Sequence, residues 1–289
     1  MRALVPMTAA LVSSLLGCLG PTRFADVSYD DRFGEATTLD VFVPAGGGPA
    51  PAVVLFHAGA FTSGDKSEYH AAAERLALSG YVAVTVNHRL APGAPFPAAV
   101  QDAACALSFL RARAEDYGIE PERMAAVGYD SGAHLAAMLG VAAGAPDVAP
   151  DCEAGATGPP AAVVASAGFY DLTRLAGERG IEPYVGAALD EAEDLYAAAS
   201  PALRAGAGAP PFLLVHGDFD FVVPPDQSKI MRDALIAQGN DVRLLELFDP
   251  GHFLAAGADN GGLYGGGVKD RPESWIVFMA FLEETIGLP

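Results

Sequence analysis

The chain has 289 residues, of which 51% are hydrophobic and only 18% charged, which allows a large core and argues against general disorder. Its 17 basic and 36 acidic residues give a net charge of −19, which argues against nucleic acid or an anionic membrane surface as a partner. This length fits one large α/β domain or two small ones.

The first residues have the pattern of an export signal. One positive charge is followed by an apolar stretch that is too short for a membrane span and ends at small residues. The run "LLGC", ending at Cys18, resembles the lipobox of bacterial lipoproteins, in which cleavage before the cysteine frees it for lipidation. We expect a signal peptide over residues 1–17 and a linker over 18–26. The protein would be a periplasmic or cell-envelope lipoprotein, or secreted, with membrane contact only through this lipid; an ordinary signal peptide cut nearby is the alternative.

Two cysteines remain if Cys18 is lipidated. Cys105 and Cys152 form an even pair, and disulfides persist in the oxidising compartment that export implies. The sequence does not give their separation, so a disulfide and two unrelated buried thiols are equal alternatives.

Apolar, β-branched runs alternate with stretches of helical length along the rest of the chain. The middle runs are almost continuously hydrophobic, as in strands that are covered on both faces. The predicted strands lie at residues 38–44, 52–57, 81–87, 123–129, 161–168, 212–217 and 242–248. The predicted helices lie at residues 66–80, 96–118, 131–143, 228–239 and 274–287. This alternation predicts one domain over residues 27–289, built on a mostly parallel, doubly wound sheet.

Residues 170–205 interrupt the alternation with a small helical, loop-rich insertion between two strands. Such an insertion could act as a cap over the carboxyl ends of the strands, where open α/β sheets bind ligands. A surface excursion without a role is an equal alternative.

The stretch "AAVGYDSGAHLAAMLG" at residues 125–140 has the pattern of a strand, a sharp turn and a helix. Such a turn exposes one side chain at its tip and needs small residues two positions before and after it. Gly128 and Gly132 fill both places only if Asp130 is the tip, because a register centred on Ser131 would put a tyrosine at a crowded position. Asp130 therefore takes the place of a nucleophile, and Ser131 is expected to offer its backbone N–H to an oxyanion.

Three further loops follow predicted strands. In the first, "LFHAGAFTSGDKS" at residues 55–67, Gly59 and Ala60 are expected to donate backbone N–H groups to an oxyanion hole. The second loop offers Asp220 as an acid, and the third places His252 after the next strand. The order tip, acid, histidine is that of α/β hydrolases.

From about residue 30 to its end the chain resembles α/β-hydrolase carboxylesterases of the hormone-sensitive-lipase and feruloyl-esterase-like groups. The segment "VNHRLAPGAPFPAAVQDA" resembles their Tyr-Arg-Leu-Ala-Pro…Phe-Pro-Ala segment, and residues 55–67 resemble their His-Gly-Gly-Gly loop, with Ala58 and Ala60 in place of two glycines. The resemblance implies an α/β-hydrolase fold with a mostly parallel eight-stranded sheet and a pocket for a small ester. It also implies triad-type roles for Asp220 and His252.

An aspartate at the tip changes the chemistry that this fold can perform. A carboxylate that attacks an ordinary ester forms an anhydride, whose carboxylate leaves more readily than an alkoxide. Haloalkane dehalogenases and epoxide hydrolases carry aspartate at this tip and attack an sp³ carbon with it. Beside His252, a carboxylate at position 130 would also tend to keep the imidazole protonated.

Four functions remain open at this stage, one of them a purely structural lipoprotein. The first is hydrolysis of a small ester or acyl substrate with Asp130 at the elbow, through Ser131, an activated water or Asp130 itself. The alternatives are a non-catalytic protein that binds a small ligand in the esterase-type pocket, and a hydrolase that attacks an sp³ carbon through Asp130. No cofactor or metal is expected, because the histidines lack ligand spacing and no Gly-x-Gly-x-x-Gly fingerprint follows the first strand.

Overall fold

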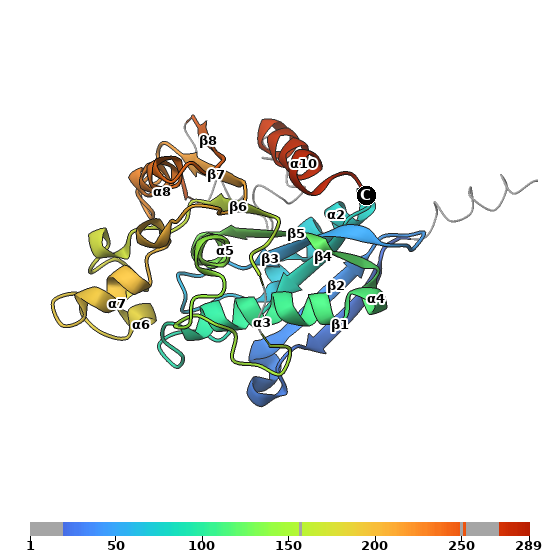
Figure 1. Cartoon of the computed structure of the whole chain (residues 1–289), viewed down its shortest axis with the longest axis horizontal. Helices are drawn as coiled ribbons and strands as arrows, with labels where there is room; N and C mark the ends of the chain where they lie inside the picture. The colour runs from blue at the N-terminus through green and yellow to red at the C-terminus, as the bar shows by residue number, and fades with distance from the viewer. Residues whose placement is uncertain (1–19, 156–157, 249–250, 253–271) are drawn as a thin grey trace, which may run out of the picture.

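The computed structural model describes residues 20–155, 158–248, 251–252 and 272–289, which form a layered α/β domain with helices on both faces of one sheet (Figure 1). The sheet has eight strands in the order β1-β2-β4-β3-β5-β6-β7-β8. Only the β1–β2 and β2–β4 pairs are antiparallel, which confirms the predicted mostly parallel sheet. The strands are β1 Thr22–Ser28, β2 Thr38–Val43, β3 Ala50–Phe56, β4 Val82–Val86, β5 Ile119–Tyr129, β6 Ala162–Ser166, β7 Phe212–Gly217 and β8 Val242–Leu247.

Helices cover both faces of this sheet, and the central strands β3, β4, β6 and β7 are buried along their whole length. Helices α3 and α5 pack on one face, and α2 and α10 pack on the other (Figure 1). The α-helices are α2 His70–Leu78, α3 Ala98–Ala112, α4 Ala114–Tyr117, α5 Ser131–Ala142, α6 Ile181–Val185, α7 Glu193–Ala198, α8 Asp226–Ala237 and α10 Pro272–Ile286. The 3₁₀ helices are η1 Asp31–Thr37, η2 Lys66–Tyr69, η3 Leu172–Arg174 and η4 Pro201–Arg204. Within the described ranges, no helix combines the length and the apolar character that crossing a bilayer requires.

The N-terminal part differs from the sequence expectation in one respect. All seven strands predicted from the sequence pattern are present, and β1 at Thr22–Ser28 is the eighth strand, which overlaps the segment 18–26 that was expected to be a linker. Five of its seven side chains are exposed, so no buried apolar face marks it in the sequence; backbone pairing with β2 makes it a strand. The expected signal peptide and the lipidation of Cys18 lie outside the described residues and stay predictions.

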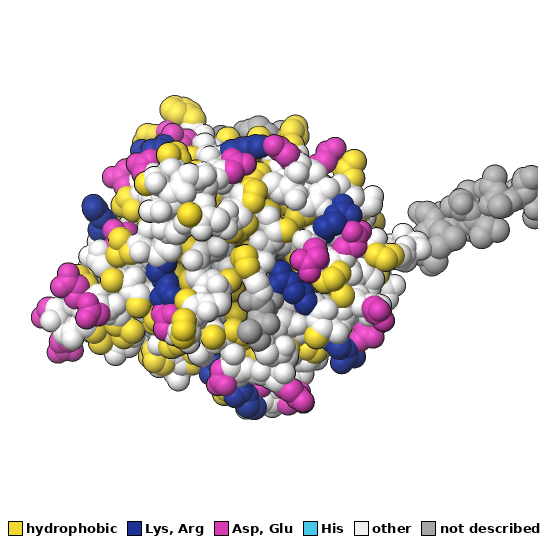
Figure 2. Space-filling view, viewed as in Figure 1, with side chains coloured by type: hydrophobic (Ala, Val, Ile, Leu, Met, Phe, Trp, Pro, Cys, Tyr) yellow, Lys and Arg dark blue, Asp and Glu magenta, His cyan; other side chains and the backbone are white. Residues whose placement is uncertain are grey.

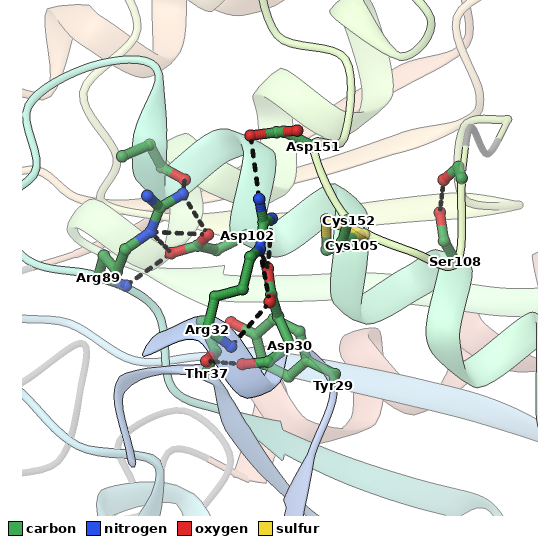
Figure 3. Close-up of a disulfide and its surroundings, with 12 residues drawn as sticks. Tyr29, Asp30, Arg32, Thr37, Arg89, Asp102, Cys105, Ser108, Asp151 and Cys152 are labelled. Atoms are coloured by element: carbon green, nitrogen blue, oxygen red, sulfur yellow. Dashed lines mark hydrogen bonds and ion pairs between the residues drawn. A yellow bond between two sulfur atoms is a disulfide. The ribbon is translucent and has the colours of Figure 1, made fainter. Parts of the chain in front are cut away.

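Cys105 of α3 and Cys152 of the loop after α5 form a disulfide, with 6.0 Å between their Cα atoms (Figure 3). Next to it, Arg32 of η1 reaches the Asp151 carboxylate at 3.4 Å. The disulfide joins positions 47 residues apart in the chain. Cross-links of this kind stabilise a fold by about 2–4 kcal/mol, mainly by restricting the unfolded chain. Of the two alternatives for these cysteines, the structure contains the disulfide.

The insertion between β6 and β7 is helical, as predicted, and contains η3, α6, α7 and η4. It projects at one end of the sheet (Figure 1). Acidic side chains gather at this end of the molecule, whereas acidic and basic side chains are mixed over the rest of the same face (Figure 2). The exposed acidic residues of the insertion are Glu178, Glu182, Asp190, Glu191, Glu193 and Asp194.

Candidate functional site

Asp130 lies alone in the turn between β5 and α5, with φ 58° and ψ −122°. Residues other than glycine rarely adopt these backbone angles, which are strained for a residue with a Cβ. The turn is also tight. A Cβ on Gly128 would lie 2.1 Å from the carbonyl oxygen of Gly132, and a Cβ on Gly132 would lie 2.0 Å from that of Phe56. The two glycines therefore allow the turn, and Asp130 lies at its tip, as the register predicted.

The loop after β3 faces this tip, because β3 and β5 are parallel neighbours in the sheet. The three residues 59–61, named here the hole loop, all have positive φ, with values of 128°, 49° and 65°. The backbone N–H groups of Gly59 and Ala60 donate to the same oxygen, Oδ2 of Asp130, at 3.0 and 2.7 Å. The two groups that were predicted to stabilise an oxyanion are therefore bonded to a carboxylate of the protein itself.

Asp220 and His252 lie in the loops after β7 and β8, and the structure brings both to Asp130. The Asp220 Oδ1 accepts from the backbone N–H groups of Val222 and Val223 at 2.9 and 2.8 Å, which fixes the carboxylate. Its Oδ2 lies 2.7 Å from His252 Nδ1. On the other side of the ring, His252 Nε2 lies 3.3 Å from Asp130 Oδ1. The three side chains form a buried row with the imidazole in the middle, and their residues are 4–5% exposed.

This row is a cation between two anions. Burial lowers the pKa of His252, but hydrogen bonds and charges from Asp130 and Asp220 outweigh it and raise the pKa to about 9. Burial acts against both carboxylates too, yet the pKa of Asp130 is lowered by the hydrogen bond and charge of His252. The pKa of Asp220 is lowered by hydrogen bonds to His216 and His252. At neutral pH the imidazole is protonated and has no free lone pair to act as a base.

Ser131 has no access to the pocket through its hydroxyl. The residue is completely buried, and its Oγ has no hydrogen-bond partner in the part of the chain that the structure describes. Its backbone N–H does contribute, because hydrogen bonding to the carboxyl of Asp130 helps to lower the pKa of that group. Ser131 is therefore not placed as a displaced nucleophile, whereas its backbone N–H is directed at the Asp130 carboxyl.

Two polar side chains at this site were not predicted as functional. The ring of His216 lies behind Asp220, with Nε2 3.3 Å from Asp220 Oδ2 and Nδ1 2.7 Å from Ser228 Oγ. The Tyr129 hydroxyl donates to the backbone carbonyl of His252 at 2.7 Å. The spacing of His216, four residues before Asp220, could have indicated the first contact. The second joins residues 123 positions apart, and no sequence pattern marks it.

A pocket of about 330 Å³ opens above Asp130 and His252. This volume suits a small molecule. The pocket is lined by two residues of the hole loop and by apolar, polar and charged residues around them: Ala58, Gly59, Ala60, Ser63, Tyr129, Asp130, Phe169, Glu178, Arg179, Phe221, Val222 and His252. Glu178 and Arg179 belong to the insertion, which therefore borders the site. A wider hollow of about 690 Å³ lies inside the insertion and contains none of the predicted site residues.

No metal site accompanies this pocket in the described parts of the chain, where no group of three or more histidine, cysteine, aspartate or glutamate side chains is placed to hold an ion. The residues that line the pocket include side chains and backbone N–H groups that can bond to a ligand. Of those, the N–H groups of Gly59 and Ala60 are already bonded to Asp130.

Comparison with known sequences gives one family. The pattern of the BD-FAE family matches residues 39–235. Esterase LipC of Mycobacterium tuberculosis is 30% identical over 213 residues, which are 71% of this chain and 53% of LipC. Isoprenylcysteine alpha-carbonyl methylesterase ICME of Arabidopsis thaliana is 26% identical over 231 residues, which are 76% of this chain and 54% of that protein. The chain thus spans about half the length of the curated relatives it matches.

Solved structures share the fold. A truncated form of a carbohydrate esterase from gut microbiota superposes with a TM-score of 0.77 at 21% identity, covering 93% of this chain and 99% of that chain. An esterase of Thermogutta terrifontis with bound propionate superposes with a TM-score of 0.74 at 23% identity, covering 93% and 96% of the two chains. At these identities the likeness concerns the fold alone.

Proposed function

Because the chain belongs to the BD-FAE family of α/β-hydrolase-fold esterases, we propose that its pocket accepts a small neutral ester and that Asp130 makes the protein bind this ligand without serine-type turnover. One observation carries the proposal: Asp130 Oδ2 accepts both N–H groups of the hole loop, at 3.0 and 2.7 Å. An ester carbonyl that undergoes attack needs such donors for its developing negative charge. In this site they are occupied before any ligand arrives.

Each route to ester hydrolysis lacks a chemical group that it needs. Ser131 is buried, so it offers no hydroxyl to a substrate. A water would need a base, and His252 is protonated at neutral pH because its pKa is about 9. Attack by Asp130 itself would form an anhydride only by expelling an alkoxide. The alkoxide is a poorer leaving group than the Asp130 carboxylate, so the addition would reverse. What remains is a shaped pocket that can hold an ester in its ground state.

The charge of the site indicates which ligands fit. Asp130, Asp220 and the His252 cation leave an excess of one negative charge on the pocket floor. The walls are partly apolar, with Phe169, Phe221 and Val222 among them. Esterase structures of Thermogutta terrifontis contain propionate and butyrate. In this chain a carboxylate would meet the Asp130 carboxylate where it needs hydrogen-bond donors, so we propose that neutral esters are favoured over the corresponding acids.

Binding of butyrate should therefore depend on position 130. We expect ethyl butyrate to raise the Tm of the wild-type protein and sodium butyrate to leave it unchanged. Asp130→Ala frees the hole loop and removes the competing charge, so it should bind butyrate at least about tenfold more tightly than wild type, a difference of 1.4 kcal/mol. Thermal shift and isothermal titration calorimetry measure both effects, and proton NMR of the mixture reports release of free acid. Equal butyrate affinity in both proteins, or acid released by wild type above the buffer rate, would contradict the proposal.

The hydrogen bonds from the hole loop to Asp130 Oδ2 also favour a second candidate function, hydrolysis at an sp³ carbon. If Asp130 Oδ1 attacked an alkyl carbon, a carbon–oxygen bond would form while the leaving group departed with its electron pair. The carbonyl of the resulting ester would be Oδ2, which already accepts the hole-loop N–H groups. Loss of the Asp130 charge would lower the pKa of His252, which could then take a proton from the water that cleaves the ester.

An alkylated intermediate would be the evidence for this second function. In His252→Phe the water would lack its base, so incubation with 1,2-epoxybutane should add the mass of one epoxide to the protein, located at Asp130 by peptide mapping. Asp130→Asn is the control, since its amide cannot form the ester. An unchanged mass in a folded His252→Phe protein, together with no diol formed by wild type, would eliminate this candidate.

A further inference from the structure

The hole loop is held in a conformation that its sequence does not favour. Ala60 and Phe61 are consecutive non-glycine residues with φ of 49° and 65°. This region costs free energy for any side chain with a Cβ, so contacts from outside must hold the loop there. Within its own turn, the backbone N–H groups of Thr62 and Ser63 donate to the Gly59 carbonyl oxygen at 3.0 and 3.2 Å, and their hydroxyls donate to the same oxygen.

One of these outside contacts comes from α6 in the insertion, and another is the backbone N–H of Ala91, which donates to the Phe61 carbonyl oxygen at 2.9 Å. The rings of Phe61 and Tyr184 are stacked, with centroids 3.8 Å apart and planes 14° apart. The Tyr184 oxygen lies 2.9 Å from Nε2 of His134, whose Nδ1 lies 2.8 Å from the carbonyl oxygen of Phe169. Burial lowers the pKa of His134 to about 4, so the ring is neutral; Nδ1–H donates to the carbonyl and Nε2 accepts from the Tyr184 hydroxyl.

These bonds connect the hole loop to the helix that follows the tip. His134 lies on α5, and its backbone N–H donates to the carbonyl oxygen of Asp130 at 3.3 Å. Tyr184 therefore bridges Phe61, on the donor side of the hole, and the first turn after Asp130, on the acceptor side. Gly180 adds a second contact, since a Cβ there would lie 2.1 Å from the Ala60 carbonyl oxygen.

We propose that Tyr184 is a positioning residue for the oxyanion hole, which holds Phe61 so that the N–H groups of Gly59 and Ala60 stay directed at the oxygen bound between them. The insertion thereby acts on the reactive centre and does more than border the pocket. This inference rests on the hole assignment of the proposed function. It concerns the geometry of the donors, which exists whether the bound oxygen belongs to Asp130 or to a ligand.

Tyr196 provides a matched control for Tyr184. Both tyrosines lie in the insertion and both are 1% exposed, but the Tyr196 hydroxyl donates to the Ala187 carbonyl at 3.0 Å, away from the hole loop. In the otherwise wild-type protein, Tyr184→Leu should move the amide proton resonances of Gly59 and Ala60 upfield, because their hydrogen bonds to Asp130 lengthen. Tyr196→Leu should leave both resonances in place, and Tyr184→Phe, which keeps the stacked ring, should move them less than Tyr184→Leu.

A kinetic measurement follows in the Asp130→Ser background, where the hole is free for a substrate. There Tyr184→Leu should lower kcat by about tenfold or more and leave KM within about twofold, because misplaced donors weaken binding of the transition state more than binding of the ground state.

If Tyr184→Leu and Tyr196→Leu move the two amide resonances equally, or if neither moves them, the positioning role is wrong. If Tyr184→Leu fails to fold, the comparison of Tyr184→Phe with Tyr196→Phe decides. An inactive Asp130→Ser protein with shifted resonances would count against the proposed function and would leave the positioning role intact.

Discussion

Asp130→Ser is expected to raise kcat/KM for p-nitrophenyl butyrate by about 10³-fold over the wild-type protein. The substitution removes the carboxylate that occupies the N–H groups of Gly59 and Ala60. It also places a hydroxyl at the tip, where Asp130 Oδ1 now lies 3.3 Å from His252 Nε2. Since one of the two anions beside the imidazole is lost, the pKa of His252 should fall, which makes the ring available as a base.

The size of this effect comes from two separate gains. An available oxyanion donor is worth about 10²–10³ in kcat. A correctly placed general base contributes roughly 10²–10⁴. The expected gain lies below their product, because Ala60 stands where the resemblance implies glycine and keeps the hole loop under strain.

Two variants separate these contributions when initial rates are measured by release of p-nitrophenolate. Asp130→Ala opens the hole without supplying a nucleophile and should stay near the wild-type rate. Asp130→Ser combined with His252→Ala keeps the nucleophile without its base and should lose most of the gain. A wild-type rate equal to that of Asp130→Ser would mean that Asp130 supports ester hydrolysis itself, and the binding proposal would then be wrong.

The second large effect is on stability against pH. The free energy of unfolding of the wild-type protein should fall by about 3 kcal/mol through His252 alone between pH 6 and pH 10. The pKa of His252 is about 9 in the folded protein, against about 6.5 in an unfolded chain. A raised pKa means that the folded state binds the extra proton. This stabilisation is therefore complete below pH 6.5 and is lost as the pH rises through 9.

Asp130→Asn should reduce this loss, because an amide next to Nε2 can donate to the neutral ring and no longer favours the cation. Urea unfolding at a series of pH values measures the difference, and the imidazole proton signal of His252 gives its pKa directly. Other groups titrate in the same range, so the comparison is between variants at each pH. Asp194→Asn, at an exposed position of the insertion, is the control for a lost surface charge. Parallel curves for wild type and Asp130→Asn would show that the pair is not coupled.

The chain order of the motifs was enough to predict most of the sheet and which side chains meet at its carboxyl edge. Gly128 and Gly132 determined that Asp130 and not Ser131 is the tip, because only glycine tolerates the close backbone contacts of this turn. The order of Asp220 and His252 after successive strands placed both at the same edge, since the carboxyl ends of parallel strands meet there. Strand β1 escaped prediction because its side chains are mostly exposed.

The bonding inside the site could not be predicted in this way. That the carboxylate of Asp130 turns one oxygen to the hole loop and the other to His252 depends on its rotamer, and a residue type does not specify a rotamer. The stack of Tyr184 on Phe61 joins an insertion to a loop that lies more than a hundred residues earlier. Aromatic residues at such distances carry no periodic pattern, and their pairing follows from packing in three dimensions.

The bond between the hole loop and Asp130 changes what natural selection can preserve here. In a serine enzyme, a mutation that misdirects the donors of Gly59 or Ala60 would be removed because catalysis suffers. In this protein the same mutation leaves a buried carboxylate without its hydrogen bonds, so it is harmful through folding alone. The hole can therefore persist through evolution without any reaction to maintain it. In descendant proteins that keep the aspartate, an intact oxyanion hole would show selection for a stable fold and not for catalysis. A later mutation of Asp130 back to serine would find the donor geometry for catalysis still in place.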